Sequence, residues 1–165
     1  MRGDRFACYH FAMSHTGDKQ CFTAEVFIVH KDKVLLRMHD KYKIWLSVGG
    51  HIEPNEDPNQ AALREVKEEV GLDVVLWDEG QKFTVNEGTF RNLVPPVGLN
   101  CHMSDTNEHV TLVYFATASA DKVVPEKTSD EWRWVSKEEL GSMDLRENVR
   151  EYALGALKAL GTSSS

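Results

Sequence analysis

The clearest structural signal in this chain is the segment GHIEPNEDPNQAALREVKEEVGL, residues 50–72. It opens with turn-forming residues, EPNEDP at 53–58, and continues into a helical pattern. Asp57 suits the N-cap, Pro58 is favoured in the first turn, and Gly71 follows the last apolar residue of the pattern. The sequence therefore predicts a helix from Pro58 to Val70.

Three glutamates of this predicted helix share one face. At about 100° per residue, Glu65, Glu68 and Glu69 fall within an arc of roughly 100°. Like charges at this spacing repel one another, whereas a hard cation such as Mg²⁺ binds carboxylate oxygens. The pattern indicates either a Mg²⁺ site or a solvated acidic face. An apolar stripe beside the glutamates is expected to pack on a sheet, and it consists of Ala62, Leu63, Val66 and Val70.

Two neighbouring features favour the metal interpretation. Arg64 precedes Glu65 directly and Glu68 by four residues, so its guanidinium can orient a carboxylate. Gly49 and Gly50 end a strand predicted over residues 44–48, and a glycine backbone can approach a metal or a phosphate closely. A simple tight turn is the alternative interpretation of the glycine pair.

The rest of the chain alternates strands with a few helices. β-Branched and aromatic runs predict strands over residues 21–30, 34–38, 110–116 and 131–135, with further strands inside 72–85 and 90–101. A short helix is predicted from Ser136, and a longer one from Leu145 to Leu160. These elements predict an α+β or three-layer α/β/α fold with a curved sheet. We expect one domain over residues 21–160, an N-terminal arm at 1–20 and a flexible tail at 161–165.

Composition limits the classes of partner. The chain has 165 residues, 41% of them hydrophobic, and a formal net charge of −7, which opposes binding to a nucleic-acid polymer. Three separated cysteines form no disulfide framework, and no apolar run reaches the ~18 residues of a membrane span. Seven histidines show no HExxH or similarly tight spacing, so strand or surface histidines are expected. We expect a cytoplasmic protein that is a monomer or a homodimer.

Residues 50–72 resemble the Nudix box of MutT-like hydrolases. Gly50, Glu56 and the run REVKEEVGL at residues 64–72 match every fixed position of that pattern, and a weaker likeness covers about residues 21–160. The resemblance implies an α/β/α sandwich with a curved mixed sheet. It also implies a pyrophosphohydrolase that cleaves a diphosphate linked to another group, with Mg²⁺, or alternatively Mn²⁺, as the cofactor.

The resemblance also implies roles for individual residues. Glu65, Glu68 and Glu69 are the implied metal ligands, with the carbonyl of Gly49 as an additional one. Arg64 is implied to orient Glu65.

Further carboxylates are implied to support the metal site. Glu56 matches the first glutamate of the box and acts directly or through water. A later loop often adds a carboxylate, for which Glu126 is the candidate and Glu108 the alternative. The general base is Glu65 or, if Glu65 binds the metal, a loop glutamate.

Substrate recognition is expected from loops around residues 39–45, 86–107 and 141–148. Gly50, His51, Trp45 and Asn148 are the candidate substrate-binding residues. The expected substrate is a small nucleoside diphosphate derivative: a nucleoside triphosphate first, then ADP-ribose or a sugar nucleotide. A prenyl diphosphate isomerase that uses Cys101 and a non-catalytic nucleotide-sensing module are the alternatives.

Overall fold

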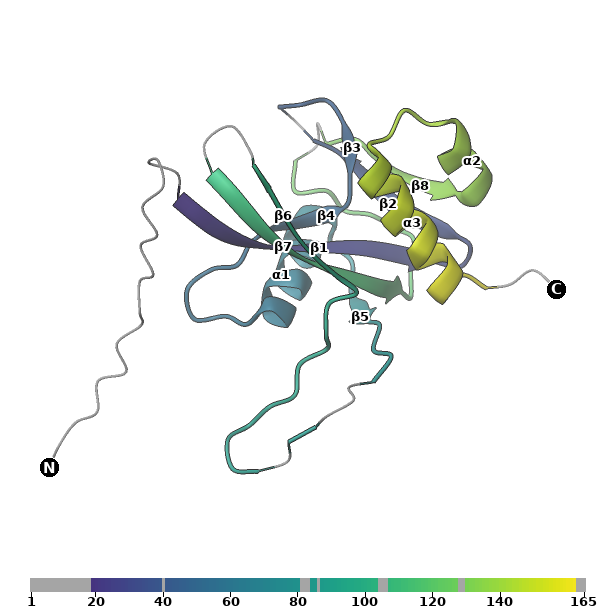
Figure 1. Ribbon diagram of the computed structural model, residues 1–165. Helices are drawn as coiled ribbons and strands as arrows, with labels where there is room; N and C mark the ends of the chain where they lie inside the picture. Colours follow the sequence, from purple (N-terminus) through teal and green to yellow (C-terminus); the bar gives the residue numbers. More distant parts are fainter. Residues whose placement is uncertain are drawn as a thin grey trace, which may run out of the picture.

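The computed structural model describes residues 19–39, 41–80, 84–85, 87–103, 107–127 and 130–162 (Figure 1). Most of the expected arm, residues 1–18, and residues 163–165 of the expected tail lie outside this description. The described residues form eight strands and three helices. The strands are β1 Lys19–His30, β2 Lys33–Met38, β3 Trp45–Leu46, β4 Val48–His51, β5 Val74–Leu76, β6 Gly98–Met103, β7 Asn107–Ala118 and β8 Trp132–Ser136. The helices are α1 Pro58–Val70, α2 Lys137–Ser142 and α3 Glu147–Leu160.

Two long strands organise the mixed sheet. β1 and β7 run parallel, in a register that extends from Lys19 opposite Asn107 to Val29 opposite Thr117. β1 also pairs antiparallel with β2 and β4, and β7 pairs antiparallel with β5 and β6. β3 and β8 complete the sheet by pairing with β2. The expected curved mixed sheet is confirmed.

Helices cover both faces of the sheet (Figure 1). Side chains alternate along β1, so that Ala24 and Val26 join the core under α1 whereas Phe27 and Val29 join the core under α3. Apolar residues of α1 and α3 complete these two cores. The arrangement is the expected α/β/α sandwich.

Helix α1 has the predicted bounds. The carboxylate of Asp57 accepts hydrogen bonds from the backbone N–H groups of Asn59 and Gln60, and the side-chain Oε1 of Gln60 accepts the backbone N–H of Asp57 to complete a capping box. Gly71 ends the helix at a φ of 68°, which favours glycine. The predicted apolar stripe was wrong at one position. Leu63 lies at the edge of the apolar face, and its exposed fraction is 42%.

The glycine pair does not end a strand as expected. The predicted strand 44–48 is divided at Ser47 into β3 and β4, and β4 continues through both glycines to His51. The reason is that β1 supplies a pairing partner for each residue, including Glu25 opposite Gly49 and Thr23 opposite His51. The glycines therefore lie in the sheet, beside its central strand.

The region between α1 and β7 contains less regular structure than its composition suggests. β5 is one three-residue strand within the predicted 72–85, and β6 begins only at Gly98. The last helix begins at Glu147, two residues later than predicted. None of the described helices has the length and apolarity that crossing a membrane requires.

Candidate functional site

The acidic face of α1 lies against the glycines of β4. A Cβ atom added to Gly50 would lie 2.4 Å from Oε1 of Glu65, so only glycine leaves room for this carboxylate. At Gly49, a Cβ atom would lie 2.2 Å from the carbonyl oxygen of Ala24, and φ is 155°. The glycine pair thus lets helix and sheet approach each other at the point where the glutamates gather.

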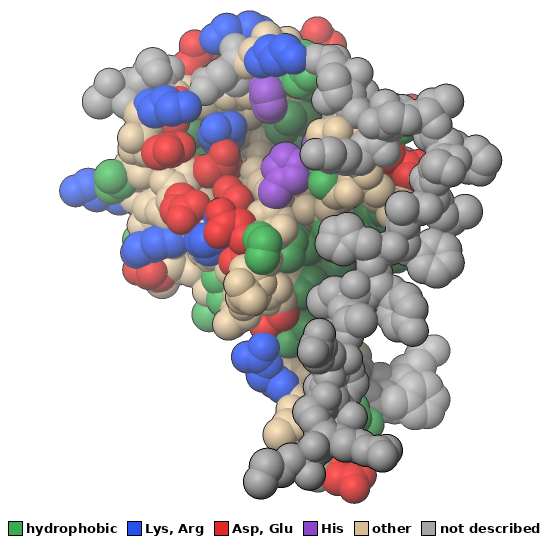
Figure 2. Space-filling view, turned by 90° about the vertical axis from the view of Figure 1, so that its left-hand side faces the viewer, with side chains coloured by type: hydrophobic (Ala, Val, Ile, Leu, Met, Phe, Trp, Pro, Cys, Tyr) green, Lys and Arg blue, Asp and Glu red, His purple; other side chains and the backbone are tan. Residues whose placement is uncertain are grey.

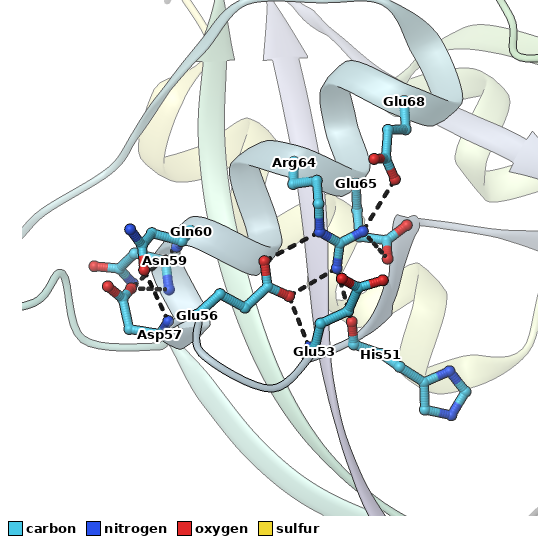
Figure 3. A network of polar contacts seen from close by, with 9 residues as sticks. All are labelled: His51, Glu53, Glu56, Asp57, Asn59, Gln60, Arg64, Glu65 and Glu68. Carbon is cyan, nitrogen blue, oxygen red and sulfur yellow. Dashed lines mark hydrogen bonds and ion pairs between the residues drawn. The ribbon is translucent and has the colours of Figure 1, made fainter.

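Arg64 connects three of the predicted glutamates (Figure 3). Its Nε donates to Glu56 Oε2 at 3.0 Å and its Nη2 donates to Glu56 Oε1 at 2.8 Å. Its Nη1 donates to Glu65 Oε1 at 2.8 Å and to Glu68 Oε2 at 3.0 Å. Nη2 also donates to the carbonyl oxygen of His51 at 2.9 Å. One guanidinium therefore orients the first box glutamate, two helix glutamates and the end of β4.

These contacts affect the acidity of the groups involved. The hydrogen bonds from Arg64 lower the pKa of Glu56, and those to Glu56, Glu65 and Glu68 raise the pKa of Arg64. Glu56 also accepts a hydrogen bond from the backbone N–H of Glu53 at 2.7 Å. Glu56 is thus held as a carboxylate that supports Arg64.

Glu69 lies in a different environment, close to the sheet. Its Oε1 is 2.9 Å from Nη2 of Arg37 on β2, and its Oε2 accepts the backbone N–H of Gly49 at 3.1 Å. Burial nevertheless raises the pKa of Glu69 to about 7, with smaller contributions in the same direction from Glu65 and Glu126. A cation beside these carboxylates would relieve the cost of ionising Glu69.

Of the two candidate loop glutamates, the structure brings Glu126 to this group. Its backbone N–H donates to the carbonyl oxygen of Glu69 at 3.2 Å, and its charge contributes to the raised pKa of Glu69. Glu108 lies near the start of β7, where its Oε2 accepts a hydrogen bond from Gln20 at 2.9 Å.

A cavity of about 530 Å³ opens next to the glycines. Tyr42, Ile44 and Leu46 give it an apolar wall. The glycines Gly49 and Gly50 also line it, together with the polar residues Glu25, His51, His102, His109 and Arg146. In Figure 2 the acidic side chains lie directly beside histidine side chains on one face of the molecule. The cavity places a mixed apolar and polar surface next to the carboxylates.

Glu25 is a buried carboxyl group in this cavity that sequence reasoning missed. It accepts a hydrogen bond from Ser47 Oγ at 2.9 Å, and burial raises its pKa. Arg37 was missed as well, although a charged residue within the apolar run VLLRM was a usable signal. The role of Glu25 was harder to see, because it depends on which face of β1 the cavity occupies.

The predicted substrate-binding residues are only partly brought together. Gly50 and His51 line the 530 Å³ cavity. Trp45 packs against the core under α3 and lines a separate cavity of about 240 Å³. Asn148 is exposed on α3, and its neighbour Arg146 lines the larger cavity. Cys101 pairs with Val110, so strand alternation directs it away from the face that carries His102 and His109, which gives the isomerase alternative no support.

Comparisons with known proteins agree with this fold. The profile of the NUDIX domain matches residues 21–156. A nucleoside triphosphatase NudI from Salmonella schwarzengrund is 30% identical over 120 residues, which cover 70% of this chain and 77% of that protein. The crystal structure of a hydrolase of the NUDIX family from Clostridium perfringens is 36% identical, with a TM-score of 0.74, and the match covers 84% of this chain and 97% of that one. An Ap4A hydrolase from C. elegans shares the fold at 18% identity and a TM-score of 0.59, with 84% and 93% covered.

Proposed function

This chain belongs to the Nudix hydrolase family, and on that basis we propose that it cleaves the diphosphate bond of a nucleoside diphosphate derivative, using Mg²⁺ and water. The observation that carries the proposal is the gathering of Glu65 and Glu69 at the glycines of β4, with Glu68 joined to Glu65 through Arg64. Arg64 and Arg37 orient these carboxylates.

The residues present fit Mg²⁺. They offer several carboxylate oxygens, and Mg²⁺ prefers oxygen ligands together with water and substrate phosphates. The burial of Glu69 beside Glu65 and Glu126 leaves negative charge that Arg37 balances only in part. When bound, Mg²⁺ neutralises phosphate charge and lowers the pKa of a coordinated water. Glu65, Glu68 and Glu69 are the proposed ligands, with the Gly49 carbonyl as an additional one.

The remaining residues have supporting roles in this proposal. Arg64 fixes the carboxylates of Glu56 and Glu65, so that their oxygens are oriented before substrate arrives. Because Glu65 is one of the proposed metal ligands, we assign removal of the water proton to the loop glutamate Glu126, whose backbone N–H donates to the carbonyl oxygen of Glu69.

The cavity beside the carboxylates is proposed to hold the nucleoside. Its volume of about 530 Å³ is typical of small-molecule sites. Tyr42, Ile44 and Leu46 offer an apolar surface for a base, and Glu25 offers an acceptor for its N–H groups. Arg146 offers a positive charge at the cavity wall.

We rank nucleoside triphosphates first among substrates. The Salmonella relative is named a nucleoside triphosphatase, which supports this order. The fold alone does not decide the substrate, since an Ap4A hydrolase shares it. ADP-ribose and sugar nucleotides follow in the ranking.

Product analysis across a panel of substrates tests the proposal. Nucleoside triphosphates, dinucleoside polyphosphates, ADP-ribose and sugar nucleotides are incubated with the protein in Mg²⁺, in Mn²⁺ or in EDTA, and the products are separated by ion exchange. We expect metal-dependent release of a nucleoside monophosphate from at least one of them. Calorimetric binding of a nucleotide without cleavage would instead support the nucleotide-sensing module. Double-bond migration in a prenyl diphosphate, without phosphate release, would support the isomerase.

A further inference from the structure

A second group of side chains, all of types that can ligate a metal, lies on the sheet. It consists of Cys21 on β1, His51 on β4 and His109 on β7. The Sγ atom of Cys21 and a ring nitrogen of each histidine all lie within 4.8 Å of one another. No local sequence motif indicates this group, because its members are 30 and 58 residues apart along the chain.

The sheet register explains why these residues meet. Cys21 lies directly opposite His109 in the parallel pairing of β1 with β7. On the other side of β1, His51 lies opposite Thr23, which is two residues from Cys21 and on the same face. Three adjacent strands therefore present their side chains to one point, and the rings of His51 and His109 are 5.2 Å apart.

The imidazole of His51 is directed away from the glutamate network. Figure 3 shows its carbonyl facing Arg64 while the ring points to the opposite side. The ring of His102 on β6 is 5.3 Å from that of His109, which adds a further imidazole to the same face. The imidazole of His51 thus points away from the glutamates bound by Arg64, into the wall of the 530 Å³ cavity that His109 also lines.

We propose that Cys21, His51 and His109 form a site for Zn²⁺ or a similar divalent transition metal, distinct from the Mg²⁺ site. Thiolate and imidazole are ligands that Zn²⁺ prefers, whereas Mg²⁺ prefers oxygen. With Zn–S and Zn–N bonds of about 2.3 and 2.0 Å, ligand atoms in a tetrahedral site lie roughly 3.3–3.6 Å apart. Side-chain rotations that bring the donor atoms up to about 1.5 Å closer together reduce the observed spacing to these values. Three protein ligands leave a fourth position for water or His102.

Zn²⁺ binding at this site would release one proton, from the thiol of Cys21. The Cys21 thiol lies 3.8 Å from the carbonyl oxygen of Glu108, to which it can donate. Because the thiolate is the form that binds metal, one proton passes from Cys21 to the solvent when Zn²⁺ binds. The contact with Glu108 is replaced by the metal–sulfur bond, and the ion then joins β1, β4 and β7.

Spectroscopy with Co²⁺ and competition with Zn²⁺ test the site in the full-length protein without a histidine tag. Co²⁺ bound to Cys21 should give a thiolate charge-transfer absorption that one equivalent of Zn²⁺ abolishes and excess Mg²⁺ does not. Cys21→Ser should remove this absorption. Cys21→Ser and His109→Gln should each weaken Zn²⁺ binding by at least about 100-fold, measured against a chromophoric chelator.

Matched controls locate the metal. Cys101→Ser changes an exposed cysteine outside the group, so it should keep the absorption and the Zn²⁺ affinity. Glu68→Gln should also leave both unchanged, because it alters only the glutamate site. The proposal is overturned if Zn²⁺ does not bind, if Mg²⁺ displaces it, or if Cys21→Ser binds it as tightly as the unmodified protein.

Discussion

Arg64 binds the carboxylate of Glu56 through two hydrogen bonds, from Nε at 3.0 Å and from Nη2 at 2.8 Å. The two N–H groups match the two carboxylate oxygens, a geometry that a lysine ammonium cannot reproduce. Because the remaining donors of the same guanidinium reach Glu65, Glu68 and the carbonyl of His51, this pair fixes the position of the carboxylates that we propose as metal ligands.

Arg64→Lys should therefore lower kcat/KM by about 10–100-fold while leaving the fold intact. Lysine keeps the positive charge but lacks the planar, paired N–H donors of the guanidinium. Steady-state kinetics at saturating Mg²⁺ measure the effect. Arg133→Lys is the matched control, because Arg133 is a half-exposed arginine that pairs with Glu139 away from the site. Equal activity of both variants and the unmodified protein would show that the orientation supplied by Arg64 does not matter.

Glu68→Gln should weaken Mg²⁺ binding and lower activity by at least about 100-fold. Glu68 is the most exposed of the three helix glutamates and contacts only Arg64 among the ion pairs described, so the metal-free protein should lose less than about 1 kcal/mol of stability. Calorimetric titration measures the Mg²⁺ affinity, and urea unfolding in EDTA measures the stability of the metal-free protein. Unchanged Mg²⁺ affinity would remove Glu68 from the ligand set.

The two loop glutamates should differ in their importance. Glu126→Gln should lower kcat by about 100-fold or more, as expected for a general base, with a smaller effect on KM. Glu108→Gln should have activity close to that of the unmodified protein, because Glu108 lies at the start of β7. Kinetics on both variants decide the assignment, and the reverse order of effects would transfer the role to Glu108.

The pH dependence of stability should reveal Glu69. Its pKa is about 7 in the folded protein, above its ordinary value of 4.5, so the folded state binds more protons between these values. The metal-free protein should therefore lose stability as the pH rises through this range. Glu69→Gln should lack that component, which is about 1–3 kcal/mol between about pH 5 and pH 8.

Urea unfolding in EDTA at both pH values measures the difference between the two proteins. Loss of the contact between Glu69 and Arg37 affects the variant at both values, so comparing the two pH values isolates the titration. An identical pH dependence in the two proteins would mean that burial does not raise the pKa of Glu69.

Local signals predicted the elements around α1 well. Its bounds follow from Asp57, Pro58 and Gly71, whose effects act within one turn of the helix. The acidic face was equally predictable, because helical periodicity alone brings Glu65, Glu68 and Glu69 together. The pattern did not show that Gly49 and Gly50 belong to a strand, since that depends on pairing with β1, more than twenty residues earlier.

Residues that meet across strands were the ones that sequence reasoning missed. Arg37 reaches Glu69 from β2, and Glu25 enters the cavity from β1. Trp45 was predicted to contact the substrate because it is an aromatic residue near the glycines, but it lines a different cavity. Such positions depend on register and on which face of the sheet a side chain occupies, and a single sequence does not determine either.

Hydrolysis of a nucleoside triphosphate in ¹⁸O-labelled water tests the central claim most directly. We expect turnover that requires Mg²⁺, stops in EDTA, places one labelled oxygen in a phosphate product, and is lost in Glu65→Gln and Glu68→Gln. Unlabelled phosphate products, or turnover that continues in EDTA and in both variants, would contradict it.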